Sequence, residues 1–175
     1  MKKDLFIFLI LSIFLLTSCN VDNIKISDNI IAPDNITPPI SGEWIIEDYK
    51  LSSISAMDEE KAQSYIGKEV LFDKKLVAIG DNYCFDPLFK VKNVNATDYL
   101  IYQYKANPKF LNIEDKEIHV ISVIGKEQFF YEFIKESEET IIINIDGVFF
   151  YLKKVSDKVE DEKIAEYYYE DKAIL

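Results

Sequence analysis

The sequence predicts a mainly β domain, a strand-rich α+β fold built as a small antiparallel barrel or a strongly curved sheet, with one helix near residues 56–66. Three observations predict it. Short apolar runs in the last third are separated by turn-forming pairs. Both sides of these runs are apolar, so both faces of the sheet must be covered. Only one stretch of the folded region carries helix start and stop signals together.

The chain begins with a basic start at Met1-Lys2-Lys3 and an apolar run from Leu5 to Leu16. This order is typical of a secretory signal peptide, which we expect over residues 1–18. The alternative is a retained membrane anchor. A twelve-residue helix spans roughly 18 Å, however, well short of the ~30 Å hydrocarbon core. Length therefore favours the signal peptide.

Residues 19–41 are expected to form a tether between the leader and the domain. They are rich in Asn, Asp and Ser, lack sustained periodicity and contain Pro33, Pro38 and Pro39. Adjacent prolines stop a helix and stiffen the chain. The globular domain is expected over residues 42–155, followed by an acidic tail over residues 156–175.

The domain begins with a predicted strand at Gly42–Tyr49 and then the clearest helix. Ser55, followed three residues later by Asp58, is similar to a capping box, and the acidic residues that follow suit a helix N-terminus. Gly67 provides the C-terminal stop. We interpret the apolar stripe of this helix as core packing.

Further strands are expected along the rest of the domain. The earlier ones are Val70–Phe72, Leu76–Ile79 and Asp98–Tyr104, with Pro108 interrupting the pattern. The last third predicts a four-stranded antiparallel meander over residues 117–155. Its strands are Glu117–Ile124, Gln128–Lys135, Thr140–Ile145 and Val148–Val155, with turns at Gly125-Lys126 and Asp146-Gly147. Asp-Gly is a favoured type I′ pair.

Strand alternation places aromatic side chains on both faces of the meander. In the second of its strands, Phe129, Tyr131 and Phe133 are predicted on one side, and Phe130 and Ile134 on the other. The last strand likewise separates Val148, Phe150 and Leu152 from Phe149 and Tyr151. The sheet is therefore covered on both sides, or closed around an apolar lumen.

The tail at residues 156–175 combines acidic residues with Tyr167-Tyr168-Tyr169. We interpret it as solvated and partly helical. The alternative is a segment that docks a partner, because neighbouring tyrosines and carboxylates offer stacking and hydrogen bonding.

Charge excludes nucleic acid as a partner. The chain has 20 basic and 31 acidic residues, a net −11, and no arginine; losing residues 1–18 would make it −12. Such a surface repels phosphate backbones. Acidic faces attract basic partners instead.

Reaction chemistry has little support in the sequence. His119 is the only histidine, which excludes a multi-histidine zinc site, and we expect it to be packed or at a rim. No phosphate, dinucleotide or calcium motif is present in a chain with 5 glycines. We expect no catalytic residue, metal or cofactor, and no enzyme.

Leu16-Thr17-Ser18-Cys19 resembles the lipobox of bacterial lipoproteins. The resemblance implies cleavage before Cys19 and a diacylglyceryl group on its sulfur. Two acyl chains hold a protein stably at a bilayer. The expected location is the extracytoplasmic face of the cell membrane, with the lipid on Cys19 as the anchor.

Gly42-Glu43-Trp44 and Thr97-Asp98-Tyr99 resemble two motifs of the lipocalins. The resemblance implies a barrel whose Trp44 plugs the closed end and whose lumen carries a small apolar ligand. An open sheet packed on the helix, with Trp44 as an ordinary core residue, is the alternative. If a lumen exists, Trp44, Phe130 and Phe150 are the candidate ligand-binding residues.

Two functions remain. The first is an anchored binding module for a small apolar or amphipathic ligand, since ligand pockets are concave and mostly apolar. The second is a protein-interaction lipoprotein without a small-molecule ligand, an inhibitor or an envelope assembly partner. Its partner would be a basic envelope protein.

Overall fold

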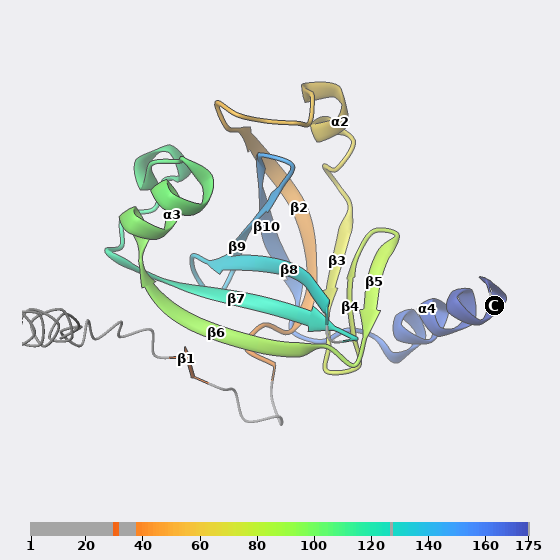
Figure 1. Ribbon diagram of the computed structural model, residues 1–175. Helices are drawn as coiled ribbons and strands as arrows, with labels where there is room; N and C mark the ends of the chain where they lie inside the picture. The colour runs from red at the N-terminus through yellow and green to blue at the C-terminus, as the bar shows by residue number, and fades with distance from the viewer. Residues whose placement is uncertain (1–29, 32–37, 127, 175) are drawn as a thin grey trace, which may run out of the picture.

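The structure is a computed structural model that describes residues 30–31, 38–126 and 128–174. Within these residues, ten strands and four helical segments follow one another (Figure 1). The strands are β1 (Ile30–Ile31), β2 (Gly42–Leu51), β3 (Glu69–Phe72), β4 (Leu76–Ile79), β5 (Asn82–Phe85), β6 (Leu88–Asn95), β7 (Glu117–Gly125), β8 (Gln128–Lys135), β9 (Thr140–Ile145) and β10 (Val148–Ser156). The helical segments are α2 (Glu59–Gln63), α3 (Ala96–Tyr104), the 3₁₀-helix η1 (Pro108–Leu111) and α4 (Asp161–Ile174).

All strands belong to one strongly curved antiparallel sheet in the order β1-β6-β7-β8-β9-β10-β2-β3-β4-β5. From β2 to β5 and from β6 to β10, each strand pairs with the next in sequence, and β10 pairs with β2. In the described part of the chain no ladder joins β5 to β6, so the ring of strands stays open there. The predicted fold class is confirmed in its curved-sheet form, and the closed barrel is not formed.

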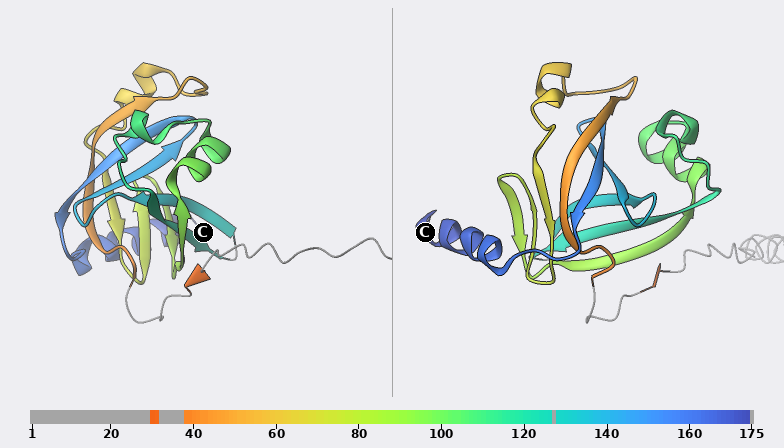
Figure 2. Two further views of the ribbon diagram at one scale, coloured as in Figure 1. Left: turned by 90° about the vertical axis from the view of Figure 1, so that its left-hand side faces the viewer. Right: turned by 180° about the vertical axis from the view of Figure 1, so that it is seen from behind.

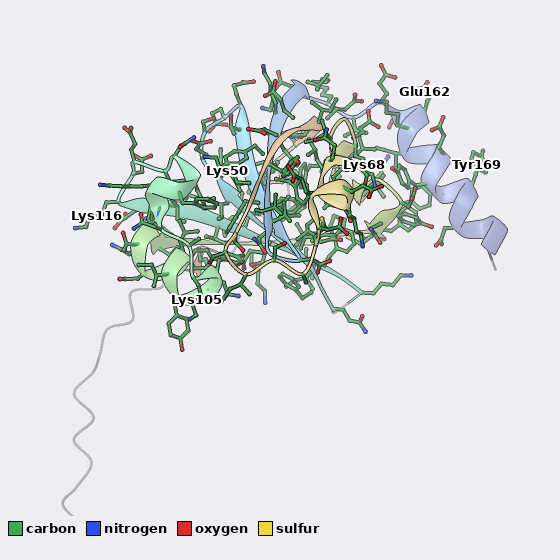
Figure 3. All side chains as sticks on the ribbon, turned by 90° about the horizontal axis from the view of Figure 1, so that it is seen from above. Lys50, Lys68, Lys105, Lys116, Glu162 and Tyr169 are labelled. Carbon is green, nitrogen blue, oxygen red and sulfur yellow. The ribbon has the colours of Figure 1, made fainter. Side chains whose placement is uncertain are left out.

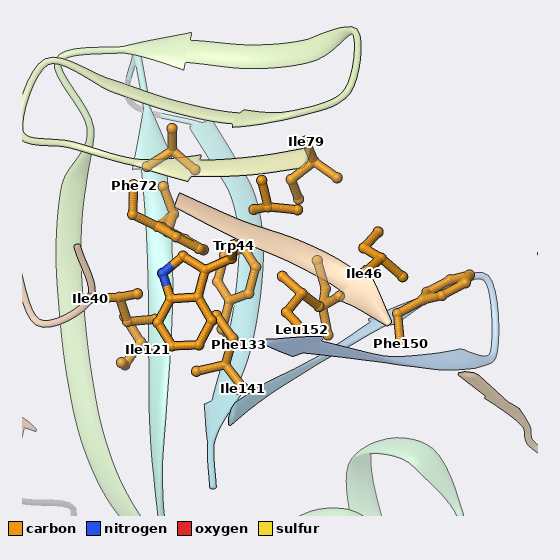
Figure 4. Close-up of a cluster of buried hydrophobic side chains, with 14 of the residues drawn as sticks. Ile40, Trp44, Ile46, Phe72, Ile79, Ile121, Phe133, Ile141, Phe150 and Leu152 are labelled. Atoms are coloured by element: carbon orange, nitrogen blue, oxygen red, sulfur yellow. The ribbon is translucent and has the colours of Figure 1, made fainter. Parts of the chain in front are cut away.

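The concave side of the sheet encloses the largest apolar cluster (Figure 4). Strands from both halves contribute to it, and Phe72 of β3 meets Phe133 of β8 edge to face with 4.9 Å between ring centroids. Met57 and Ala62, next to and within α2, close one end of this cluster. The predicted core role of that helix is confirmed.

Two helical covers lie on the convex side (Figure 2). The first consists of α3 and η1, whose Leu100 and Leu111 are fully buried against β7–β10. The second is α4, whose Ile164 is buried against Leu71 and Leu76 of β3 and β4. The sheet is thus covered on both faces, as its two apolar faces predict, and the C-terminal segment packs on the domain through its helix.

The four-stranded meander over residues 117–155 is confirmed as β7–β10. Its last turn has positive φ at both Asp146 and Gly147, at 53° and 85°, as a type I′ pair requires. In β10, Val148, Phe150 and Leu152 face the concave cluster, while Phe149 faces α3. The predicted sides of this strand are therefore right.

The helix predicted near residues 56–66 is present but shorter, over Glu59–Gln63. Its N-cap is Asp58, whose carboxylate accepts a 2.8 Å hydrogen bond from the Lys61 amide. Ser55, which we expected to open a capping box, instead accepts a hydrogen bond from the Met57 amide. Gly67, with a φ of 84°, then lets the chain turn into β3.

The strand predicted at Asp98–Tyr104 is wrong, because these residues belong to α3. The Asn95 side chain caps this helix by accepting a 3.0 Å hydrogen bond from the Asp98 amide. Ala96 and Leu100 lie one turn apart and are both buried against the sheet. Capping and burial together outweigh the β propensity of the Tyr- and Ile-rich segment. Thr97-Asp98-Tyr99, the second lipocalin-like motif, therefore lies on a helix.

A β-bulge in β8 changes the predicted faces of that strand. Val123 pairs with Tyr131 and Ile124 with Phe129, so Phe130 is the extra residue. Phe130 and Tyr131 consequently both pack against the concave cluster, while Phe129 is 65% exposed. Phe129 and Phe133 therefore do not share a buried side.

The signal peptide expected at residues 1–18 and the expected lipidation site, Cys19, lie outside the described residues. Of the expected tether, residues 30–31 and 38–41 are described. Ile30 and Ile31 pair with Lys92 and Val91, so the tether adds a short strand to the edge of β6.

Candidate functional site

Two of the three residues predicted to bind a ligand, Trp44 and Phe150, are packed core residues. Trp44 is 3% exposed, contacts Phe72 edge to face and donates a 3.1 Å hydrogen bond from Nε1 to the Ser41 carbonyl. Phe150 is fully buried and stacks on Tyr65 with 4.9 Å between centroids. Protein side chains thus occupy the positions around both rings (Figure 4). Phe130, in contrast, lines a hollow of the described surface.

That hollow lies where the sheet fails to close, and we call it the seam groove. Its volume is about 350 Å³. One wall is β5, the opposite wall is the β7–β8 hairpin, and Asp171 of α4 borders it. The residues that matter most are Tyr83, Cys84 and Phe85 of β5, Phe129 and Phe130 of β8, and Asp171 of α4.

Gly125 sets the distance between the two walls. A Cβ atom at this position would lie 2.6 Å from the Cβ of Cys84. Only a residue without a side chain lets the hairpin approach β5 this closely. Because of the β8 bulge, the Phe130 side chain points toward the concave cluster, and the Phe129 side chain is exposed to solvent.

Helix α4 extends the β5 wall with aromatic rings. Phe85 stacks on Tyr168 with 4.1 Å between centroids and an interplanar angle of 13°. Tyr83 meets Tyr167 edge to face at 5.2 Å and donates a 3.4 Å hydrogen bond to Asp171. Two of the three adjacent tyrosines therefore pack on the domain itself. The third, Tyr169, is 74% exposed.

An exposed apolar row continues from the hairpin wall across the sheet. Leu88, Ile124 and Phe129 are direct cross-strand neighbours on β6, β7 and β8. Leu88 is 57% exposed and Phe129 65%. Isolated exposed apolar residues need no explanation, but adjacent ones beside an aromatic groove make this a candidate binding surface.

The groove contains a neutral thiol. Burial raises the pKa of Cys84 to about 11, and the backbone of Val77 offsets this only in part. A thiol with that pKa is protonated at neutral pH and therefore a poor nucleophile. The charged and amide side chains that line the groove are Lys126 and Gln128 on the hairpin and Asp171 on α4. This chemistry suits binding of an apolar group more than bond making.

A second polar cluster lies under α3 and holds that helix on the sheet. Glu132 accepts hydrogen bonds from Tyr99 and from Ser122, the latter at 2.7 Å, and pairs with Lys92 at 3.3 Å. Burial, together with the nearby hydroxyl of Tyr104 and the Glu132 carboxylate, raises the pKa of Tyr99. These polar groups bind one another, so the cluster fastens the helix.

His119 is exposed on β7, where it pairs with Asn93 of β6 and Lys135 of β8, so it is not a packed core residue. It borders a hollow of about 550 Å³ together with Lys135 and Glu136. Across the described residues, His, Cys, Asp and Glu side chains form no group of three suited to hold a metal ion.

Comparison with protein-family models, curated proteins and solved structures finds no match to this chain. Among residues 30–31, 38–126 and 128–174, no helix is long and apolar enough to cross a bilayer.

The sequence analysis found Phe130 but missed the rest of the groove. Cys84 and Gly125 are 41 positions apart, and their apposition depends on the curvature of the whole sheet. One local signal was present. The consecutive aromatics Phe129, Phe130 and Tyr131 cannot alternate cleanly between two faces, which is typical of a bulge.

Proposed function

We propose that this protein is a membrane-anchored extracytoplasmic lipoprotein whose domain binds a small apolar or amphipathic ligand in the seam groove. One observation supports the binding role: at the open edge of the sheet, aromatic side chains line a groove between β5 and the β7–β8 hairpin. The anchor rests on the lipobox-like Leu16-Thr17-Ser18-Cys19.

The dimensions of the groove support a small ligand. About 350 Å³ lies at the lower end of the range typical of ligand pockets, roughly 300–1,000 Å³. Phe85, Phe129 and Phe130 provide apolar walls, and Lys126 on the hairpin provides a cation at the rim. An elongated molecule with one polar end would place its apolar part against the rings and its polar end beside Lys126.

A titration with N-phenyl-1-naphthylamine, a neutral apolar probe that fluoresces on burial, tests this site. We expect saturable binding to the full chain and its loss in the Phe129→Asp variant. The matched control is Val155→Asp, because Val155 is also a strand residue that is 65% exposed. Equal binding by both variants would place the ligand elsewhere.

A protein-interaction role is the second candidate, and the surface of α4 favours it. Tyr169 is 74% exposed on a helix whose first turn carries Asp161 and Glu162. Acidic and aromatic groups together suit a basic protein partner. Capture of a basic envelope protein at low salt by the native chain, and its loss in the Tyr169→Ala variant, would support this role.

A further inference from the structure

Helix α4 contacts the domain at two places along its length. Near its start, the ammonium of Lys163 pairs with Glu43 at 2.8 Å and also with Glu69, and the side chain of Ile164 is buried. We call Lys163 and Ile164 the α4 clasp. Asp171, which lines the seam groove, follows Lys163 by eight residues, or about 12 Å of helix. The clasp therefore holds the helix at a distance from the groove.

The second place of contact is the β5 wall of the groove. Tyr168 stacks on Phe85 with 4.1 Å between ring centroids, and the hydroxyl of Tyr83 donates a 3.4 Å hydrogen bond to Asp171. Phe85 and Tyr83 are lining residues of the groove, and Tyr168 touches one of them from the side of the helix. Contacts with α4 therefore help to fix both rings of this wall.

The alternation of β5 explains why its wall needs the helix. Cys84 packs against the concave cluster, whereas its neighbours Tyr83 and Phe85 pack with Ile164 in the cluster on the convex side. The groove thus takes lining side chains from both faces of β5. The concave one rests on the main core of the sheet, and the convex ones have α4 as their cover.

Few buried contacts hold α4 on the sheet. Of its side chains that the structure describes, Ile164 alone is buried, and Tyr169 is 74% exposed. Figure 3 shows α4 at one end of the molecule, with Glu162 and Tyr169 on it. A helix of 14 residues is marginally stable alone, and an element with few buried contacts opens at a lower free energy than the core. A ligand can therefore shift the docking equilibrium of α4.

We propose that Tyr168 is a positioning residue of the seam groove, acting through Phe85, and that ligand binding in the groove and docking of α4 favour each other. By linkage, a ligand strengthens docking by the same factor by which docking raises the affinity for that ligand. The inference rests on the proposed ligand site and adds its regulation, because whatever undocks α4 also lowers the affinity of the groove.

Titration of the full chain with N-phenyl-1-naphthylamine tests the positioning role. Tyr168→Ala is expected to raise the dissociation constant about three- to tenfold, which corresponds to the loss of one aromatic pair. Tyr168→Phe keeps the stacked ring and is expected to restore binding. Tyr169→Ala is the matched control, because it removes the neighbouring tyrosine, which is 74% exposed. Equal dissociation constants for Tyr168→Ala and Tyr168→Phe would overturn the positioning role.

Hydrogen exchange of the wild-type chain tests the coupling without any substitution. With the probe at ten times its dissociation constant, exchange of the α4 amides is expected to slow by up to about tenfold. Helix α3, which covers another part of the convex side, is the internal control and should be unchanged. Lys163→Met breaks the clasp and should speed α4 exchange in the free chain, and the probe should slow it again. Equal slowing of α3 and α4, or of neither, would overturn the coupling.

The titration of the wild-type chain separates this inference from the proposed function. Saturable binding that is lost in Phe129→Asp, together with unchanged exchange of α4, refutes the coupling alone. A wild-type chain that does not bind the probe refutes the ligand site and the coupling together.

Discussion

Phe150→Ala tests whether the concave side of the sheet is a packed core or a ligand lumen. Phe150 is fully buried, with 0% of its surface accessible to solvent. Its ring stacks on Tyr65 and contacts Tyr49. If these contacts stabilise the fold, the truncation lowers the free energy of unfolding, because it removes both buried apolar area and aromatic pairing. If the ring instead lined a ligand site, its removal would change binding more than stability.

The magnitude follows from the contacts. Burial of a Phe side chain contributes about 1.5–3 kcal/mol, and each aromatic pair adds about 0.5–1.5 kcal/mol. With a cavity left behind, the expected loss in free energy of unfolding is about 3–5 kcal/mol. Phe129→Ala, at a ring that is 65% exposed, is expected to stay within about 0.5 kcal/mol.

Urea unfolding followed by the fluorescence of Trp44, the only tryptophan, measures both variants. Equal denaturant slopes are required for the comparison to reflect stability alone. A loss below about 1 kcal/mol for Phe150→Ala would refute the packed-core account.

The remaining predictions concern an ion pair, a thiol and a turn. Lys163→Met removes the 2.8 Å partner of Glu43, which is 8% exposed, and should lower the free energy of unfolding in urea by about 1–3 kcal/mol. Lys153→Met removes one member of an ion pair that is exposed on both sides, and should lower it by less than about 0.5 kcal/mol. Cys84, with a pKa of about 11, should react with iodoacetamide roughly 100-fold more slowly at pH 8 in the folded than in the unfolded chain. The unfolded thiol ionises first, so Cys84 should also lower stability as pH rises from about 9 to 11, and Cys84→Ser should remove this part of the pH dependence. Gly147→Ala should lower the free energy of unfolding by about 1–3 kcal/mol, because φ is 85° and the new Cβ would collide with the Ile54 carbonyl oxygen. An unchanged thermal unfolding transition would contradict this turn geometry.

The meander could be predicted because its signals are local. Alternation in β10 depends on adjacent residues, and Asp146-Gly147 specifies its own turn. Helix α3 could not be predicted in this way. Its stability comes from the Asn95 cap and from burial of Leu100 against the convex face, and the second of these exists only after the sheet has formed.

The seam groove depends on contacts between distant parts of the chain. Phe85 and Tyr168 are 83 positions apart, yet their rings stack at 4.1 Å. The sequence analysis identified the tyrosine triplet as either solvated or partner-docking, but Tyr167 and Tyr168 pack on β5. The sequence around the tyrosines indicates that their rings pack against something, but it does not indicate that β5 is the strand they contact.

Native mass spectrometry of the full chain, purified gently from its own host, tests the central claim most directly. The account predicts a reproducible small-molecule adduct on the wild-type chain and on Val155→Asp, absent from Phe129→Asp and lost on unfolding. A wild-type chain at its bare mass, or an adduct that survives Phe129→Asp, would contradict ligand binding in the seam groove.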